Sequence, residues 1–249
     1  MSGSTTSLPV AGRLAWWGTA WLHGHLGPDE LLDGVLDGDV THVVLGPDPG
    51  LVTVLAGLRA AGTTALGAAF PVEGDLVGLG GPRELNDAAL DAGEVVVTVG
   101  GGTGGDHGAV GLVPTQVGPT VEWRVLPARR RQLPDVGEAD RQLRAVLLDS
   151  AERLAALDVA RWRPEIADRL LNLRHRPDVV APPGVPERCV DLAGRGLQAL
   201  GIAELALEDD GGAVSASEAQ QRLDALRPLA RAGRHALVAA CSPEVWPPS

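Results

Sequence analysis

The spacing of apolar residues at the start of the chain predicts two helices. Leu14, Trp17 and Trp21 recur at intervals of three and four within residues 13–25, which places them on one face of a helix. A proline and two acidic residues then follow a glycine, as at a typical helix start, so a second helix is expected over residues 28–36.

Five short apolar runs further along are interpreted as strands, at 39–46, 63–70, 94–99, 109–114 and 120–127. Helical patterns that end at glycine separate the first three runs. Valine-rich runs without a polar alternation are typical of parallel strands that are buried on both faces. The last two runs are joined by a Gly-Pro turn, which predicts an antiparallel hairpin.

Helical patterns dominate the second half of the chain, at 138–157, 163–176, 186–201 and 215–241, with 202–208 expected as a short strand. We therefore expect an α/β fold with a small, mainly parallel sheet and an antiparallel hairpin extension in residues 1–133. A mostly helical region, residues 134–249, would pack against it. Two domains or one continuous domain are both compatible with this pattern.

Composition excludes several kinds of chemistry. The chain has no lysine, so a phosphate-binding P-loop lysine, a Schiff base and a lysine general base are all ruled out. It also has no tyrosine, so no phenol can act as an acid, a base or a nucleophile. Arginine must therefore supply any cation that binds an anion. No motif indicates a particular cofactor.

The net charge of −11 is unevenly distributed. Residues 1–123 carry −11, whereas residues 124–188 carry 13 arginines against 10 acidic residues. An acidic first half argues against general nucleic-acid binding. The arginine-rich middle is where a small anionic ligand would be drawn, although these arginines could equally pair with acids on solvated helix faces.

The location expected from the sequence is the cytoplasm. The first residues lack the basic and apolar regions of a secretory signal, and no apolar run is long enough to cross a membrane. Cys189 and Cys241 fit no metal-binding spacing, and both are expected as reduced thiols.

The glycine-rich loop "VGGGTGGDHG" after the third expected strand contains the first candidate site. Its glycines match G-x-G-x-x-G, but strand and turn patterns follow where a dinucleotide-binding loop would open into a helix. Ligands in open α/β sheets bind at the carboxyl ends of strands, where this loop is expected. Asp106 and His107 are its chemically useful side chains and are the candidate catalytic residues.

Two other loops are expected at the same edge of the sheet and supply candidate ligand-binding residues. These candidates are Asp48, Glu73, Asp75 and Arg83, together with Gly102 and Gly105 of the glycine-rich loop. Carboxylates and a histidine that converge could serve acid–base chemistry or a divalent cation, although no metal-ligand set can be assigned from the sequence. The alternative is that these are solvated loop residues in an acidic protein.

Three further features are interpreted mainly as structural. Trp17 and Trp21 are expected to fill the core, while Trp16 is expected to be partly exposed and able to meet a partner. The pair His23 and His25 has no third ligand nearby and suits a helix end. The arginines of "PARRRQ" at 127–132 could bind a phosphate or carboxylate, or could form a solvated linker.

Two functional hypotheses remain open. In the first, the chain is a non-catalytic binding or regulatory protein that self-associates through its long helices. In the second, it is an enzyme that acts on a small anionic substrate with loop carboxylates and a histidine, with or without a divalent metal. The enzyme hypothesis requires the candidate residues of these loops to lie close together, whereas the binding-protein hypothesis does not.

Overall fold

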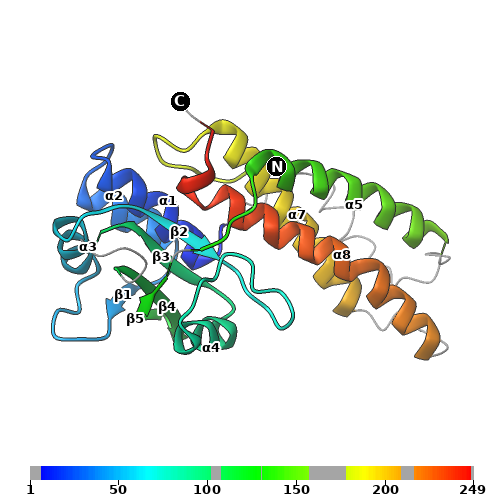
Figure 1. Ribbon diagram of the computed structural model, residues 1–249, viewed down its shortest axis with the longest axis horizontal. Coiled ribbons are helices and arrows are strands. Elements are labelled where there is room, and N and C mark those ends of the chain that lie inside the picture. The colour runs from blue at the N-terminus through cyan, green and yellow to red at the C-terminus, as the bar shows by residue number, and fades with distance from the viewer. Residues whose placement is uncertain (1–6, 102–107, 130, 157–177, 209–215, 248–249) are drawn as a thin grey trace.

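A five-stranded sheet and a set of long helices make up the chain (Figure 1). The computed structural model describes residues 7–101, 108–129, 131–156, 178–208 and 216–247. The strands are β1 (Thr41–Val44), β2 (Thr63–Ala69), β3 (Val95–Gly100), β4 (Ala109–Val117) and β5 (Thr120–Ala128). The helices are α1 (Val10–Leu22), α2 (Pro28–Leu36), α3 (Leu51–Ala60), α4 (Arg83–Ala92), α5 (Val136–Ala156), α7 (Glu187–Glu208) and α8 (Ala216–Ala240), with a short 3-10 helix, η3 (Pro243–Val245).

The sheet is mixed, and the expectation of a mainly parallel sheet is wrong. The strand order is β1-β5-β4-β3-β2, and only β1 and β5 pair in parallel. β2 runs antiparallel to β3, with Ala69 opposite Val95, so residues 70–94 leave one end of the sheet and return to the same end. The hairpin of β4 and β5 is confirmed as antiparallel.

Burial on both faces explains why the strands look parallel in the sequence. In β3, Val96 belongs to the large core under α1, whereas Val95 and Val97 belong to a smaller core that includes Leu85 of α4. Helices on both faces of a sheet require apolar residues at consecutive positions, whatever the strand direction. The valine runs therefore report two-sided burial and carry no information on direction.

The helical half is built on three long helices, α5, α7 and α8, which lie side by side (Figure 1). The short strand expected at 202–208 is wrong, because α7 continues through Gly201 to Glu208. Asp140 of α5 pairs with Arg195 of α7 and with Arg144. Burial opposes ionisation of Asp140, but the hydrogen bonds and charges of both arginines hold its pKa below the ordinary value.

The crossing of α7 and α8 depends on two glycines. A Cβ added to Gly196 would lie 3.0 Å from the Gly233 carbonyl oxygen, and one added to Gly233 would lie equally close to the Gly196 carbonyl oxygen. The helix backbones can approach this closely only because neither position has a side chain.

One apolar core extends across residue 133 and contains residues of both halves. Trp16 of α1 is fully buried in it, and its Nε1 donates a hydrogen bond to the Ala240 carbonyl of α8 at 3.0 Å. The expectation that Trp16 is partly exposed is therefore wrong. Trp17 is the half-buried neighbour, and its ring lies directly against Gly34 of α2.

The outer edge of β2 meets groups that are not strands. Thr19 Oγ1 accepts a hydrogen bond from Leu66 N–H at 2.9 Å and donates one to the Leu66 carbonyl at 3.1 Å. Two residues along, Ala68 N–H donates to the Cys241 carbonyl at 2.8 Å, and the Ala68 carbonyl accepts from the Arg131 guanidinium. The backbone N–H and carbonyl groups of Leu66 and Ala68, on the outer edge of β2, therefore all have hydrogen-bond partners.

In the part of the chain that the structure describes, no helix combines the length and the apolar character needed to cross a membrane.

We expect Gly196→Ala to destabilise the fold by about 1–3 kcal/mol, because the new methyl group overpacks a crossing that has no space for it. Gly57→Ala is the matched control. It lies on the exposed face of α3, where an added Cβ meets nothing within 4 Å, and alanine should stabilise that helix by about 0.5–1 kcal/mol. Urea unfolding of both variants measures the two changes, and a neutral Gly196→Ala would contradict this account of the crossing.

Candidate functional site

A buried carboxylate lies in the loop between β2 and α4. Val72 and Asp75 exchange two backbone hydrogen bonds, at 2.9 and 3.1 Å, around Gly74, whose φ of +78° suits glycine. This tight turn holds the Asp75 side chain, which is only 7% exposed, against α8.

Three basic residues of α8 surround Asp75. His235 Nε2 lies 3.0 Å from Asp75 Oδ1, Arg234 Nη2 donates to Oδ2 at 3.2 Å, and Arg231 Nε lies 3.9 Å from Oδ2. Burial alone would raise the pKa of Asp75, but the hydrogen bond from His235 and the charges of His235 and Arg234 outweigh it. The pKa of Asp75 is therefore below its ordinary value, and the carboxylate is ionised at neutral pH.

His235 keeps one ring nitrogen free. Its Nδ1 bonds to none of the residues that the structure describes, since its contact with Asp75 is made by Nε2. His42 also lies beside an aspartate, but both of its ring nitrogens have partners. Trp123 Nε1 donates to His42 Nδ1 at 3.3 Å, and His42 Nε2 lies 3.2 Å from Asp39 Oδ2.

Burial is the main cause of the lowered pKa of His42, although Asp39 opposes it. With both ring nitrogens occupied, His42 is a structural residue, whereas His235 has a nitrogen available to a ligand.

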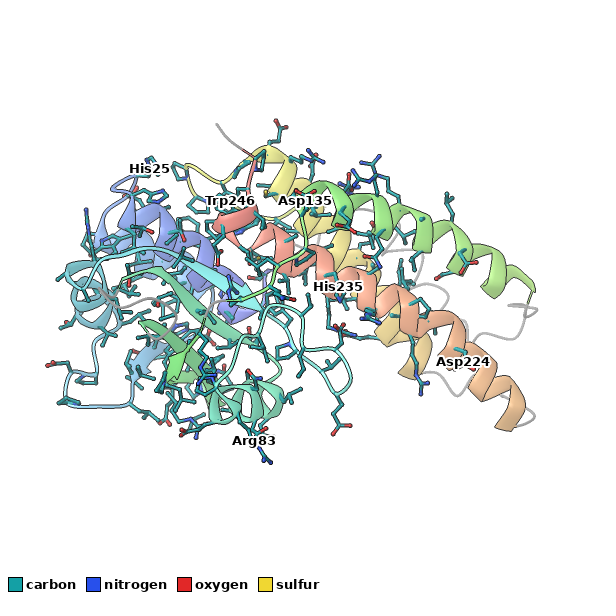
Figure 2. The ribbon with its side chains drawn as sticks, viewed as in Figure 1. His25, Arg83, Asp135, Asp224, His235 and Trp246 are labelled. Carbon is teal, nitrogen blue, oxygen red and sulfur yellow. The ribbon has the colours of Figure 1, made fainter. Side chains whose placement is uncertain are left out.

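A cavity of about 590 Å³ lies between α5 and α8, and His235 forms part of its wall. We call it the α5–α8 cavity. Figure 2 shows His235 in the last third of α8 and Asp224 nearer the beginning of that helix. The other residues that line it are Gln142, Val146, Arg227, Pro228 and Arg231.

The charged residues of this wall are mostly basic. Arg227, Arg231 and His235 lie four residues apart on α8, which puts them on one helix face. Asp224 is the only acidic residue in the described lining, and it lies 3.6 Å from Arg227. An anion in this cavity would meet more positive than negative charge.

The sequence-predicted ligand residues do not gather at one edge of the sheet. Asp48 is exposed in the loop after β1, and β1 and β2 are opposite edges of the sheet. Glu73 is exposed in the same loop as Asp75. Arg83, the first residue of α4, is 93% exposed, pairs with Asp87 and points away from the body of the molecule (Figure 2).

The predicted residues of the glycine-rich loop, Gly102, Gly105, Asp106 and His107, lie outside the described residues. The structure does describe the end of β3, which leads into this loop. This end of β3 lies at the opposite end of the sheet from the end of β2, because the two strands are antiparallel. The loops after β2 and β3 therefore do not share the edge that a parallel sheet would give them.

Sequence reasoning missed the basic residues of α8. Their signal is the four-residue spacing in "RPLARAGRH", which begins at Arg227 and places two arginines and a histidine on one face. A metal-binding group of three or more His, Cys, Asp or Glu does not occur among the described residues.

Comparison with known proteins identifies relatives of the whole chain. Residues 11–139 match the family described as Rv1486c-like protein, N-terminal domain, and residues 137–238 match the corresponding C-terminal domain. The protein named Uncharacterized protein Rv1486c, of Mycobacterium tuberculosis strain H37Rv, is 29% identical over 94% of this chain and 97% of its own length. Uncharacterized protein MT1533, of the CDC 1551 strain, matches to the same extent. No solved structure matches significantly.

We expect Asp75→Asn to lower the free energy of unfolding by about 3 kcal/mol at neutral pH, because it leaves Arg234 and His235 without their buried counter-charge. Since the folded pKa of Asp75 is lowered, its contribution is complete above the unfolded pKa of about 3.9 and is lost as the pH falls through the folded pKa. The difference between wild type and variant should therefore shrink below about pH 4.

Urea unfolding at neutral pH and at acid pH measures this difference. Glu73→Gln, in the same loop but exposed, is the matched control and should change stability by less than about 0.5 kcal/mol. A loss in Asp75→Asn that stays constant from neutral to strongly acid pH would contradict an ionic role for Asp75.

Proposed function

The chain belongs to the Rv1486c-like protein family, and we propose that it is a binding protein whose α5–α8 cavity holds a small anion such as phosphate or a compact polycarboxylate. The observation that carries this proposal is the arrangement around Asp75. One buried carboxylate holds His235, whose Nδ1 is free, in a cavity wall that also contains two arginines.

Asp75 supports the proposal by fixing the geometry of the basic residues. An imidazole bonded through Nε2 to an ionised carboxylate keeps its orientation, and in its protonated form its Nδ1–H can donate to an anion. Arg231 lies near the same carboxylate but is 60% exposed, so its guanidinium can still pair with an anion. A fixed histidine beside accessible arginines is a suitable frame for binding an oxyanion.

The composition of the cavity wall favours a polar ligand. Val146 and Pro228 are the apolar residues of the described lining, and the remaining members are charged or carry an amide. A volume of about 590 Å³ is within the ordinary range for small-molecule sites. An inorganic anion or a compact polycarboxylate would find hydrogen-bond donors here on Gln142, Arg227 and Arg231.

The cytoplasmic location is also part of this proposal. Cys189 and Cys241 are both free and buried in the core, as suits a reducing compartment. Burial raises the pKa of the Cys189 thiol to about 11 and also raises that of Cys241, so neither is a reactive thiolate at neutral pH. Self-association through the long helices stays a prediction.

Isothermal titration calorimetry at low ionic strength tests the proposed site, with inorganic phosphate and citrate as probes. We expect at least one of them to bind the wild type, and we expect Arg231→Gln to weaken that binding about tenfold through loss of a charge-assisted contact. Arg83→Gln is the matched control, because Arg83 is exposed and remote from this cavity wall.

Absence of binding for both probes, or an equal loss in Arg83→Gln and Arg231→Gln, would overturn the assignment. The second result would instead indicate nonspecific electrostatic attraction of the anions.

One observation favours a second candidate function, which is general-base catalysis on an anionic ester. The Asp75–His235 pair has the arrangement of a base and its orienting carboxylate, and Nδ1 is free to take a proton from attacking water. With p-nitrophenyl phosphate, release of p-nitrophenol by the wild type and not by His235→Gln would favour catalysis. An intact ester, with phosphate still bound, would favour the binding protein.

A further inference from the structure

A second cavity, of about 640 Å³, lies against the end of β3 and shares no described lining residue with the α5–α8 cavity. We call it the β3 cavity. Its lining comes from residues 97–101 and Ala109, from the segment that contains Arg129, Arg131 and Leu133, and from Glu244 and Val245 near the C-terminus. The family descriptions assign no role to it.

Arg131 is a buried cation in the wall of this cavity. Its side chain is only 2% exposed, and it lies against Gly67 of β2, where an added Cβ would be 2.0 Å from Nη2. Its guanidinium donates to the Ala68 carbonyl at 3.3 Å, to Ser242 Oγ at 3.3 Å and to Glu244 Oε1 at 2.7 Å. The strand has a glycine at this point because the guanidinium occupies the space of a side chain.

The hydrogen-bonding capacity of Arg131 is not fully used. Its Nε is buried and has no partner among the described residues. An unpaired buried donor is costly, and most buried polar groups in folded proteins have a partner. Arg131 therefore keeps one unpaired donor, although its charge is paired with Glu244.

The balance of charge in the β3 cavity is positive. Glu244 offsets Arg131 in a 2.7 Å ion pair. Arg129, by contrast, is exposed and forms no ion pair with any side chain in the described ranges. Among the described residues, one arginine charge is thus without an ion pair, in the "PARRRQ" segment that the sequence already marks as a candidate for binding phosphate or carboxylate.

The wall also contains apolar side chains. Val97, Leu133 and Val245 contribute branched side chains, and Gly100 and Gly101 add backbone without side chains. An apolar wall beside an unpaired arginine fits a ligand with one acidic head group and an apolar body.

We propose that the β3 cavity binds a small organic anion, with its carboxylate or phosphate head group at Arg129 and its apolar body against Leu133 and Val245. This assignment is independent of the proposed function, because it concerns a different cavity and a different class of ligand.

Calorimetric titration of the full chain with octanoate tests the proposal, with acetate as the probe that has a head group but almost no apolar body. We expect octanoate to bind at least tenfold more tightly than acetate. Arg129→Gln should weaken octanoate binding about tenfold, and Arg129 is exposed, so the variant should fold. Arg124→Gln, which removes an exposed arginine of β5, is the matched control and should leave octanoate binding unchanged.

The two cavities can be separated in the same experiment. Arg129→Gln should leave the binding of phosphate or citrate as in the wild type, while Arg231→Gln should leave the binding of octanoate as in the wild type. Failure of octanoate to bind the wild type, or equal binding to wild type and Arg129→Gln, would overturn the proposal. An equal loss of both classes of probe in Arg129→Gln would show a single shared site and would also overturn it.

Discussion

The outer edge of β2 is the contact on which the arrangement of the two halves depends. At this edge Thr19 satisfies both backbone groups of Leu66, while the Cys241 carbonyl and the Arg131 guanidinium satisfy those of Ala68. An unpaired buried backbone group costs free energy comparable to a lost hydrogen bond, so α1, the end of α8 and the segment after β5 must all reach this strand together. Their meeting places the rest of α8 beside the loop that carries Asp75, and it places Arg131 in the wall of the β3 cavity.

Local elements of the fold could be predicted from the sequence, because their signals lie within a few residues. The strand expected at 63–70 is β2, and the helix expected to stop at Gly93 is α4, whose last turn ends there with φ of +76°. Strand direction could not be predicted, since a valine run records burial on both faces and nothing else. The run at 202–208 was assigned to a strand because Gly201 resembles a helix end, but packing against α8 carries α7 through that glycine.

The candidate site could be predicted only in part, for a related reason. Asp75 was singled out because it lies in a long loop, and the structure gives it three basic neighbours. All of those neighbours come from α8, more than 150 residues later in the chain, and no local pattern links the two segments. Asp48 and Arg83 were placed with Asp75 on the assumption of a parallel sheet, and that assumption failed with strand direction.

The glycine crossing of α7 and α8 restricts how this part of the sequence can change. Each glycine faces the carbonyl oxygen of the other at 3.0 Å, so a larger residue at either position meets backbone, and no change at the opposite position can make room for it. At most packed positions, a second substitution nearby can compensate for the first. Gly196 and Gly233 cannot change in this way. Substitutions should accumulate instead on the outer faces of the two helices, and the crossing should change only if an entire helix is displaced.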